Sequence, residues 1–209
     1  MNLAIFGATG RTGRHVVDQA LAAGHAVKAL VRDPARLPIH HERLTLVPGD
    51  VLDADNVEQV IAGADAVVSV LGHTATSPKD VLTVATEHML AAMRKHGVRR
   101  LVSLTGAGVA DPQDRPRLWN KAIAWLLARL QPELLADSER QAALIRRSDL
   151  DWVIVRVPRL TDQPRKGSYR VGMVGQGTGA LIGRADAADF LMQQTVDTPY
   201  LRQAPMISA

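Results

Sequence analysis

A glycine pattern near the start of the chain constrains its fold more than any other feature. Gly7, Gly10 and Gly13 follow the short apolar run of residues 3–6 with the spacing G-x-x-G-x-x-G. Glycines at this spacing allow a tight turn from a strand into a helix and let the backbone approach a diphosphate group closely. Peptide N–H groups at the start of the helix then point their partial positive charge at the phosphates. The pattern therefore predicts a dinucleotide-binding turn, with a purely structural turn as the alternative.

Short apolar segments alternate with longer helical patterns over most of the chain. Each apolar segment is nearly continuous, as expected of parallel strands that are covered on both faces. Repeated strand–helix–strand units predict an α/β fold: a single-domain Rossmann fold whose doubly wound parallel sheet has helices on both faces. Strands are expected at residues 3–6, 26–31, 44–47, 66–70, 101–104 and 152–155, and helices at residues 12–23, 55–62, 78–96, 117–130 and 136–147.

One Rossmann domain is expected over residues 1–209, because 209 residues with 46% hydrophobic composition suit a single core. After Val157 the regular alternation fails, and residues 158–183 are rich in glycine, proline and arginine. Here we expect a hairpin around residues 169–174, a short helix at 185–195 and a last strand at 206–207. The segment 158–209 is predicted to form much of the substrate side.

The composition argues against several classes of protein. The chain has no cysteine, which excludes disulfides, thiolate metal sites and cysteine nucleophiles. Its histidines show no recognised metal-binding spacing, so no metal is expected. The arginines are scattered and aromatic residues make up only 3%, so the net charge of +4 does not predict a nucleic-acid partner. Without a signal peptide or a run of ~20 apolar residues, a cytoplasmic location away from membranes is expected.

The end of the second predicted strand bears on which nucleotide is bound. The first polar residue there is Arg32, whose guanidinium suits a ribose 2′-phosphate, and Arg36 can assist it. The neighbouring Asp33 keeps NAD possible, and a solvated surface charge is the alternative role for Arg32. We therefore expect NADPH as the cofactor.

Other strand ends add residues to the same cleft, because ligands of open α/β sheets bind at the carboxyl edge. Asp50 follows the third strand and can accept the adenine amino hydrogens, while Val51 covers the ring. Leu71 and Gly72 follow the fourth strand, and Thr105 ends the fifth.

Several longer segments resemble one known family. GATGRTG, LVRDPARLP, GDVLD, AVVSVLG, AAMRKHGVRRLV and VRVPRLTDQPRKGSYRV together look like the atypical short-chain dehydrogenase/reductases, in particular the group of biliverdin reductase B and NADPH-dependent flavin reductases. The resemblance covers nearly the whole chain. It implies an NADPH-binding Rossmann domain that passes hydride to a flavin (FMN or riboflavin), as substrate rather than tightly bound cofactor, or to a linear tetrapyrrole such as biliverdin. By matching position it implies a cofactor site lined by Gly7, Thr9, Gly10, Arg11, Thr12, Gly13, Arg32, Asp50, Val51, Leu71, Gly72 and Thr105.

The chain departs from this family at the acceptor pocket. Gly106 stands where mammalian members carry a serine, and Arg159 stands where they carry a histidine. The Tyr-x-x-x-Lys pair of most short-chain dehydrogenases is absent, since residues four beyond the two tyrosines are Met173 and Ala204. Alcohol–ketone chemistry by that pair is therefore excluded.

We expect catalytic roles for Arg159, as a positive charge near the reduced acceptor, for His73, as a proton donor or a cap on the nicotinamide, and for Thr105. A surface arginine and a polar loop histidine are the alternatives for the first two. Arg165 and Lys166 can assist Arg159. The expected partner is a small-molecule acceptor, and the expected state is a monomer or a small homo-oligomer. An NmrA-like NADP(H)-binding sensor without turnover is the alternative function, and an epimerase on sugar nucleotides is a weaker one.

Overall fold

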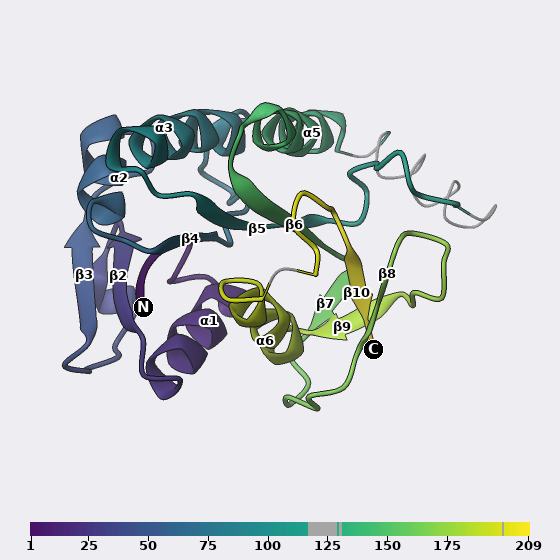
Figure 1. Cartoon of the computed structure of the whole chain (residues 1–209), viewed down its shortest axis with the longest axis horizontal. Coiled ribbons are helices and arrows are strands. Elements are labelled where there is room, and N and C mark those ends of the chain that lie inside the picture. Colours follow the sequence, from purple (N-terminus) through teal and green to yellow (C-terminus); the bar gives the residue numbers. More distant parts are fainter. Residues whose placement is uncertain (117–128, 130, 198) are drawn as a thin grey trace.

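The main sheet follows the strand order expected of a Rossmann fold. The computed structural model describes residues 1–116, 129, 131–197 and 199–209. Its larger sheet has eight strands in the order β3-β2-β1-β4-β5-β6-β10-β8 (Figure 1). All neighbouring strands in it are parallel except β8, which runs antiparallel to β10. This topology confirms the predicted fold class. The strands of this sheet are β1 (Asn2–Phe6), β2 (Ala26–Val31), β3 (Leu44–Pro48), β4 (Ala66–Ser69), β5 (Arg100–Gly106), β6 (Asp151–Val157), β8 (Arg170–Gly172) and β10 (Met206–Ser208).

The helices form where the sequence pattern predicts them, with small shifts at their ends. Gly97 ends α3 with a φ of +69°, the left-handed conformation that glycine adopts readily. Pro132 is the first residue of α5, a position that needs no backbone N–H donor. The helix predicted at 117–130 lies, apart from residue 129, outside the described residues. The helices within the described residues are α1 (Arg11–Ala22), α2 (Ala54–Ile61), α3 (Val81–His96), α5 (Pro132–Arg147) and α6 (Arg184–Gln193), with a short 3-10 helix η1 (Pro34–Arg36).

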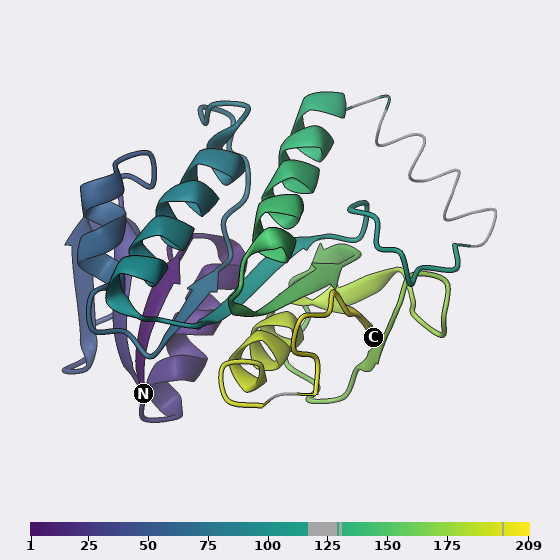
Figure 2. The same ribbon diagram turned by 45° about the horizontal axis from the view of Figure 1, so that its top comes forward.

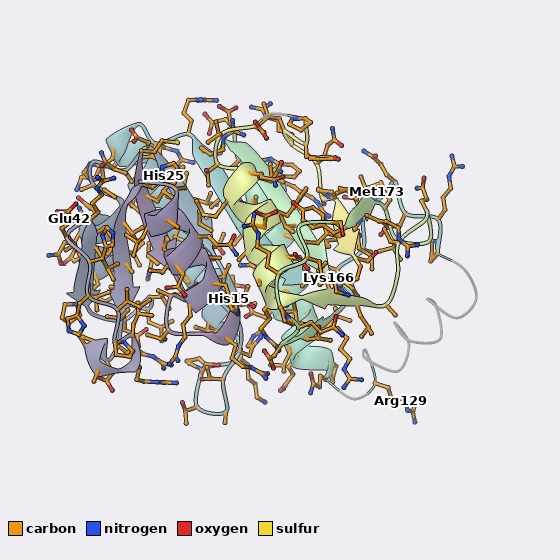
Figure 3. The ribbon with its side chains drawn as sticks, turned by 90° about the horizontal axis from the view of Figure 1, so that it is seen from below. His15, His25, Glu42, Arg129, Lys166 and Met173 are labelled. Atoms are coloured by element: carbon orange, nitrogen blue, oxygen red, sulfur yellow. The ribbon has the colours of Figure 1, made fainter. Side chains whose placement is uncertain are left out.

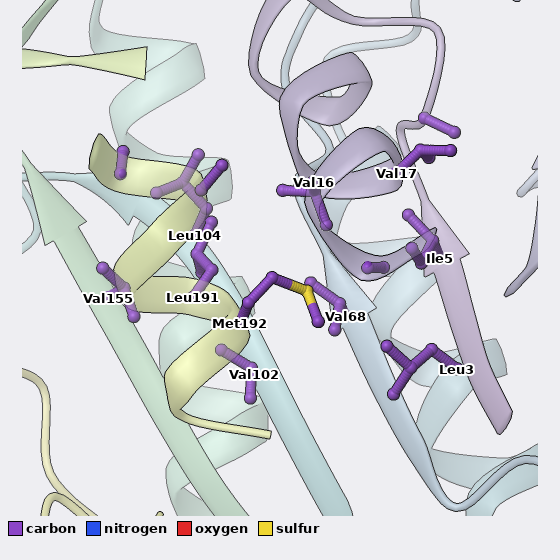
Figure 4. Close-up of a cluster of buried hydrophobic side chains, with 14 of the residues drawn as sticks. Leu3, Ile5, Val16, Val17, Val68, Val102, Leu104, Val155, Leu191 and Met192 are labelled. Carbon is purple, nitrogen blue, oxygen red and sulfur yellow. The ribbon is translucent and has the colours of Figure 1, made fainter. Parts of the chain in front are cut away.

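The helices cover both faces of the sheet. Helices α2, α3 and α5 lie side by side on one face (Figure 2), and α1 and α6 lie side by side on the other (Figure 3). Between α1, α6 and the sheet lies an apolar core that includes Leu3, Ile5, Val16, Val68 and Met192 (Figure 4). Each of these side chains is buried. The two packed layers therefore hold the strand ends of the sheet at fixed relative positions.

The segment after β6 departs from the sequence-based expectation. The hairpin expected around residues 169–174 is wrong, because β8 pairs antiparallel with the chain end β10 instead of with a neighbouring strand. A second, two-stranded parallel sheet joins β7 (Arg159–Thr161) and β9 (Leu181–Gly183). Strands this short show too little periodicity to be predicted. The predicted helix and last strand are present as α6 and β10.

A buried ion pair ties this segment to the sheet. The Arg156 guanidinium in β6 donates to both Asp114 carboxylate oxygens, at 2.6 and 2.7 Å, and to the Ala204 carbonyl at 2.7 Å. Arg156 is fully buried. Arg156 therefore links β6 both to the segment that follows β5 and to the stretch that leads into β10.

Candidate functional site

The turn between β1 and α1 is built from the glycine pattern. Gly7 adopts a φ of +85°, in the region that favours glycine. A Cβ at Gly13 would lie 2.0 Å from the Gly7 carbonyl oxygen, so only glycine lets α1 start this close to the strand. Gly10 precedes the first helical residue and has no side chain to cap the helix. The first N–H groups of α1 are therefore left for an anionic ligand such as a phosphate.

Two neighbouring cavities lie along the carboxyl ends of the strands. The smaller has a volume of about 180 Å³ and the larger about 500 Å³. Both border the point where the strand order reverses between β1 and β4, which is where doubly wound sheets bind dinucleotides. The arrangement fits one extended ligand that crosses from one cavity to the other. The residues that line both cavities are Gly10, Val70, Leu71, Gly72 and Thr74.

Arg32 lines the smaller cavity, whereas its neighbour Asp33 caps a helix. Arg32 and Arg36 both line the cavity, and Arg32 forms no ion pair among the described residues. The Asp33 carboxylate instead accepts a hydrogen bond from the Ala35 N–H at 3.0 Å and caps η1. Two guanidinium groups line this cavity and Asp33 does not, which favours a phosphorylated ribose over a free 2′-hydroxyl.

Asp50 and Val51 lie at the end of β3, on the wall of the same cavity. One Asp50 carboxylate oxygen, Oδ1, accepts a hydrogen bond from the Leu52 N–H at 3.0 Å. Among the described residues nothing donates to Oδ2, which leaves it available for an adenine amino group. His88 Nδ1 lies 3.0 Å from the Val51 carbonyl oxygen and holds this segment from α3.

Every cofactor residue predicted from the sequence lines one or both cavities. The larger cavity also brings together Thr105, Gly106 and His73 from the ends of β5 and β4. Its other wall comes from the segment after β6, with Val157, Pro158 and Leu160. The cofactor residues lining the smaller cavity are Gly7, Thr9, Gly10, Arg32, Asp50, Val51, Leu71 and Gly72, and those lining the larger are Gly10, Arg11, Thr12, Gly13, Leu71, Gly72 and Thr105.

Of the three residues predicted to be catalytic, Arg159 lies outside both cavities, as do its predicted assistants Arg165 and Lys166. Successive side chains of an extended strand point to opposite sides. Pro158 and Leu160 line the larger cavity, while Arg159 between them is exposed and lines neither cavity. Lys166 is held by its backbone N–H at 2.8 Å from Asp186 Oδ1, and Arg165 pairs with Asp189. These cations therefore belong to the loop that is tied to α6.

Arg184 is a buried cation that lines the larger cavity together with the exposed Arg11, and the sequence reasoning missed it. It is the first residue of α6 and only 7% exposed. Its Nη1 donates to Asp162 Oδ1 at 2.6 Å, and Arg11 lies 3.5 Å from the second oxygen of that carboxylate. The only sequence signal was its position immediately before the predicted helix at 185–195.

His73 is held by a second residue that the sequence reasoning missed. Its Nε2 lies 2.9 Å from Oδ2 of Asp137, a fully buried carboxylate in α5. Ser138, the next residue of α5, lines the same cavity.

Over the described residues, no group of at least three His, Cys, Asp or Glu side chains is arranged to hold a metal ion. None of the helices in that part of the chain has the length and apolar character needed to cross a membrane.

Known proteins share both the sequence pattern and the fold. A protein from a Streptomyces species described as 3-diazoavenalumate denitrifying reductase is 32% identical over 173 residues, which is 75% of this chain and 55% of that protein. Barley dihydroflavonol 4-reductase is 32% identical over 54% of this chain and 37% of its own length. The chain thus spans about half or less of these two relatives.

Two solved structures have the same fold. A short-chain dehydrogenase/reductase from Veillonella parvula, in complex with NADP, superposes with a TM-score of 0.83 at 21% identity, covering 100% of this chain and 94% of that one. ChuY, an anaerobillin reductase from Escherichia coli O157:H7, superposes with a TM-score of 0.82 at 19% identity, covering 100% and 97%.

The family match includes the glycine turn and both cavities. It extends over residues 7–198 and is described as NAD(P)H-binding. Together with the Rossmann strand order, it confirms the resemblance to atypical short-chain dehydrogenase/reductases drawn from the sequence. The chain therefore belongs to the NAD(P)H-binding family.

Proposed function

We propose that this protein is an NADPH-dependent reductase that transfers hydride to a small conjugated acceptor, either a flavin such as FMN or riboflavin or a linear tetrapyrrole. The observation that carries the proposal is the larger cavity, which continues from the cofactor cavity at Gly10, Leu71 and Gly72. An acceptor in it would lie beside the end of a cofactor whose phosphates sit at the glycine turn. Hydride transfer needs such close, oriented placement more than it needs an acid–base pair of the Tyr-x-x-x-Lys kind.

Each wall of the site has a separate task in this proposal. The first turn of α1 holds the diphosphate, Arg32 and Arg36 hold the 2′-phosphate, and Asp50 holds the adenine. NADPH, when bound, supplies the hydride. Pro158 and Leu160 give the acceptor an apolar surface, and they exclude water from the reacting face.

Arg184 takes the role that the sequence assigned to Arg159. Its buried guanidinium in the acceptor cavity would bind a phosphate or carboxylate of the acceptor, or stabilise a reduced anion. A sequence relative described as 3-diazoavenalumate denitrifying reductase and the structural neighbour ChuY, an anaerobillin reductase, are both reductases, which supports the proposal of a reductase.

The test is NADPH oxidation, followed by the loss of reduced-nicotinamide absorbance, with FMN, riboflavin and biliverdin as separate acceptors. We expect consumption above the buffer rate with at least one of them. Arg184→Met is expected to raise KM for FMN, which carries a phosphate, more than KM for riboflavin, which has none. The matched control Arg159→Met is expected to leave both KM values unchanged.

NADP(H) binding without turnover on any acceptor would overturn the reductase proposal. That result would favour an NmrA-like sensor that reports the cofactor to a partner. Equal effects of Arg184→Met and Arg159→Met on the KM values would overturn only the role of Arg184 in binding the acceptor, and the reductase proposal would stand.

A further inference from the structure

His73, which lines the acceptor cavity, contacts the buried carboxylate of Asp137. Asp137 is fully buried in α5, yet it lies 2.9 Å from Nε2 of a histidine that lines the cavity. The His73 side chain itself is 13% exposed. Burying a carboxylate is unfavourable unless hydrogen bonds compensate for the lost water, so its placement calls for a physical reason.

Apart from His73, every hydrogen-bond partner of Asp137 among the described residues is a donor. Oδ2 accepts from the Leu82 N–H at 2.9 Å, and Oδ1 accepts from the Thr83 N–H at 3.1 Å and from the Thr83 hydroxyl. Arg140 adds a cation 3.6 Å from Oδ1. The carboxylate is therefore an acceptor only, and the His73 nitrogen that faces it must carry the hydrogen.

This hydrogen bond fixes the state of the His73 ring. With Nε2–H directed at Asp137, the neutral ring has its lone pair on Nδ1, and the protonated ring has its second N–H there. Nδ1 has no protein partner among the described residues. The arrangement of a buried carboxylate that orients an imidazole and stabilises its positive form is the one used for proton transfer in acyl-transfer enzymes.

We propose that His73 and Asp137 form a proton-donating pair for the acceptor, with His73 as the catalytic acid and Asp137 as the positioning residue. The inference rests on the proposed reductase function and specifies its substrate class. Reducing a conjugated double bond by two electrons requires one hydride and one proton. The bound NADPH supplies the hydride, and the N–H bond at His73 Nδ1 breaks as its proton passes to the acceptor.

The proton that His73 gives to the acceptor is replaced from solvent water. Acceptor, NADPH and one proton give the reduced acceptor and NADP⁺. The neutral His73 then regains a proton from solvent at the cavity, while the Asp137 carboxylate keeps its hydrogen bond to Nε2. No further oxidant or reductant enters the reaction.

The pair favours one class of acceptor. A reduced flavin is a stable anion in water and does not depend on a proton from the protein. An acceptor that becomes a strongly basic anion when it takes up hydride, such as the methine-linked system of a linear tetrapyrrole, gains from an acid placed at the same cavity. We therefore infer that the site is built for the second class.

The competing explanation is structural, since Asp137 also caps the N-terminus of α3. Asp80, at the N-cap position, makes no side-chain hydrogen bond there. A matched pair of variants separates the two roles. His73→Gln and Thr83→Val each alter one side-chain partner of the Asp137 carboxylate, but only the first removes an ionisable acid.

The experiment compares both variants with the wild-type protein, using biliverdin and FMN as acceptors. We expect His73→Gln to lower kcat with biliverdin by on the order of 10²-fold, the usual contribution of a positioned acid, and to change kcat with FMN far less. Thr83→Val is expected to lower kcat with biliverdin far less than His73→Gln does, because the donating imidazole stays in place. NADPH affinity, measured by titration without an acceptor, should be the same in all three proteins.

The pH profile and a spectroscopic measurement add readouts that a structural role would not move. We expect kcat with biliverdin to fall as the pH rises, because the imidazolium is the donor, and His73→Gln to remove this dependence. The charged side chains near the pair are Arg140, 3.6 Å from Asp137 Oδ1, and Arg11 and Arg184, which line the same cavity as His73. In the free protein, nitrogen NMR of labelled histidine should show His73 with its hydrogen on Nε2, and Asp137→Asn should abolish this single tautomer.

The outcomes distinguish the two proposals. Wild-type turnover that persists in His73→Gln, or an equal loss in Thr83→Val, overturns the pair but leaves the reductase intact. A hydrogen on Nδ1 in neutral His73 also overturns the pair. Absence of turnover by the wild-type protein with every acceptor overturns the proposed function and the pair with it.

Discussion

The close approach of Gly13 to the backbone of Gly7 gives the sharpest prediction about the glycine turn. In Gly13→Ala the new Cβ would lie 2.0 Å from the Gly7 carbonyl oxygen and 2.9 Å from the Ala8 Cα, whereas ordinary contacts begin at 3.4 Å. Both neighbours are backbone, so the start of α1 must move by more than an ångström relative to β1. Overpacking of this kind costs about 1–3 kcal/mol, and the rigid neighbours place this variant near the upper value.

The same movement misplaces the N–H groups offered to the diphosphate. Losing one hydrogen bond to a charged group costs about 1.5–3 kcal/mol, which corresponds to a loss of about tenfold to a hundredfold in NADPH affinity. Urea denaturation and titration of NADPH by fluorescence measure the two effects. Gly106→Ala is the control, because a Cβ there would meet only the Gly108 backbone nitrogen, at 4.0 Å. Wild-type stability and affinity in Gly13→Ala would refute the reasoning.

Three further predictions concern charge and packing. Arg32→Ala should weaken NADPH binding by about 1.5–3 kcal/mol and leave NADH nearly unchanged, as measured by titration; equal losses would contradict a 2′-phosphate contact. Asp114→Ala should destabilise the fold by about 3–5 kcal/mol in urea, because it leaves the buried Arg156 unpaired, and a near-neutral effect would contradict this. Phe190→Ala should cost about 3–5 kcal/mol, since its ring is 2% exposed and packs edge-on against Tyr169; retention of wild-type stability would show that the core relaxes.

The Arg156–Asp114 pair also sets how stability responds to acid. Burial alone would raise the Asp114 pKa, but hydrogen bonds and charge from Arg156, with the Asp111 and Val174 N–H groups, lower it below its ordinary 3.8. A lowered carboxyl pKa contributes stability above 3.8, and this contribution is lost as the pH falls through the folded-state value. Asp114→Asn should therefore reduce the slope of stability against pH in this acidic range.

Much of the sheet and the cofactor side was predictable from the sequence. The strands β1 to β6 are nearly continuous apolar runs, and the glycine pattern lies between a strand and a helix, which is the context that predicts a dinucleotide-binding turn. Residues at the ends of successive parallel strands must meet at one edge, so the order of the strands alone assigns Arg32, Asp50 and Thr105 to one cleft.

The acceptor side was less predictable, for two physical reasons. The short strands β7, β8 and β9 carry too little periodicity, and β8 finds its partner at the far end of the chain. Alternation within β7 turns Arg159 away from the cavity, whereas Arg184 enters it from a helix start far along the chain. Asp137 reaches His73 only because α5 packs beside α3, which no local sequence pattern encodes.

Titration of the purified protein with NADP⁺ and NAD⁺ by calorimetry tests the central claim most directly. The claim is that the N-terminus of α1 binds the diphosphate while Arg32 and Arg36 select the phosphorylated ribose. We predict one NADP⁺ bound per chain with an affinity at least about tenfold higher than that for NAD⁺, the effect of about 1.4 kcal/mol from the added phosphate contacts. No binding of either nucleotide, or equal binding of both, would contradict it.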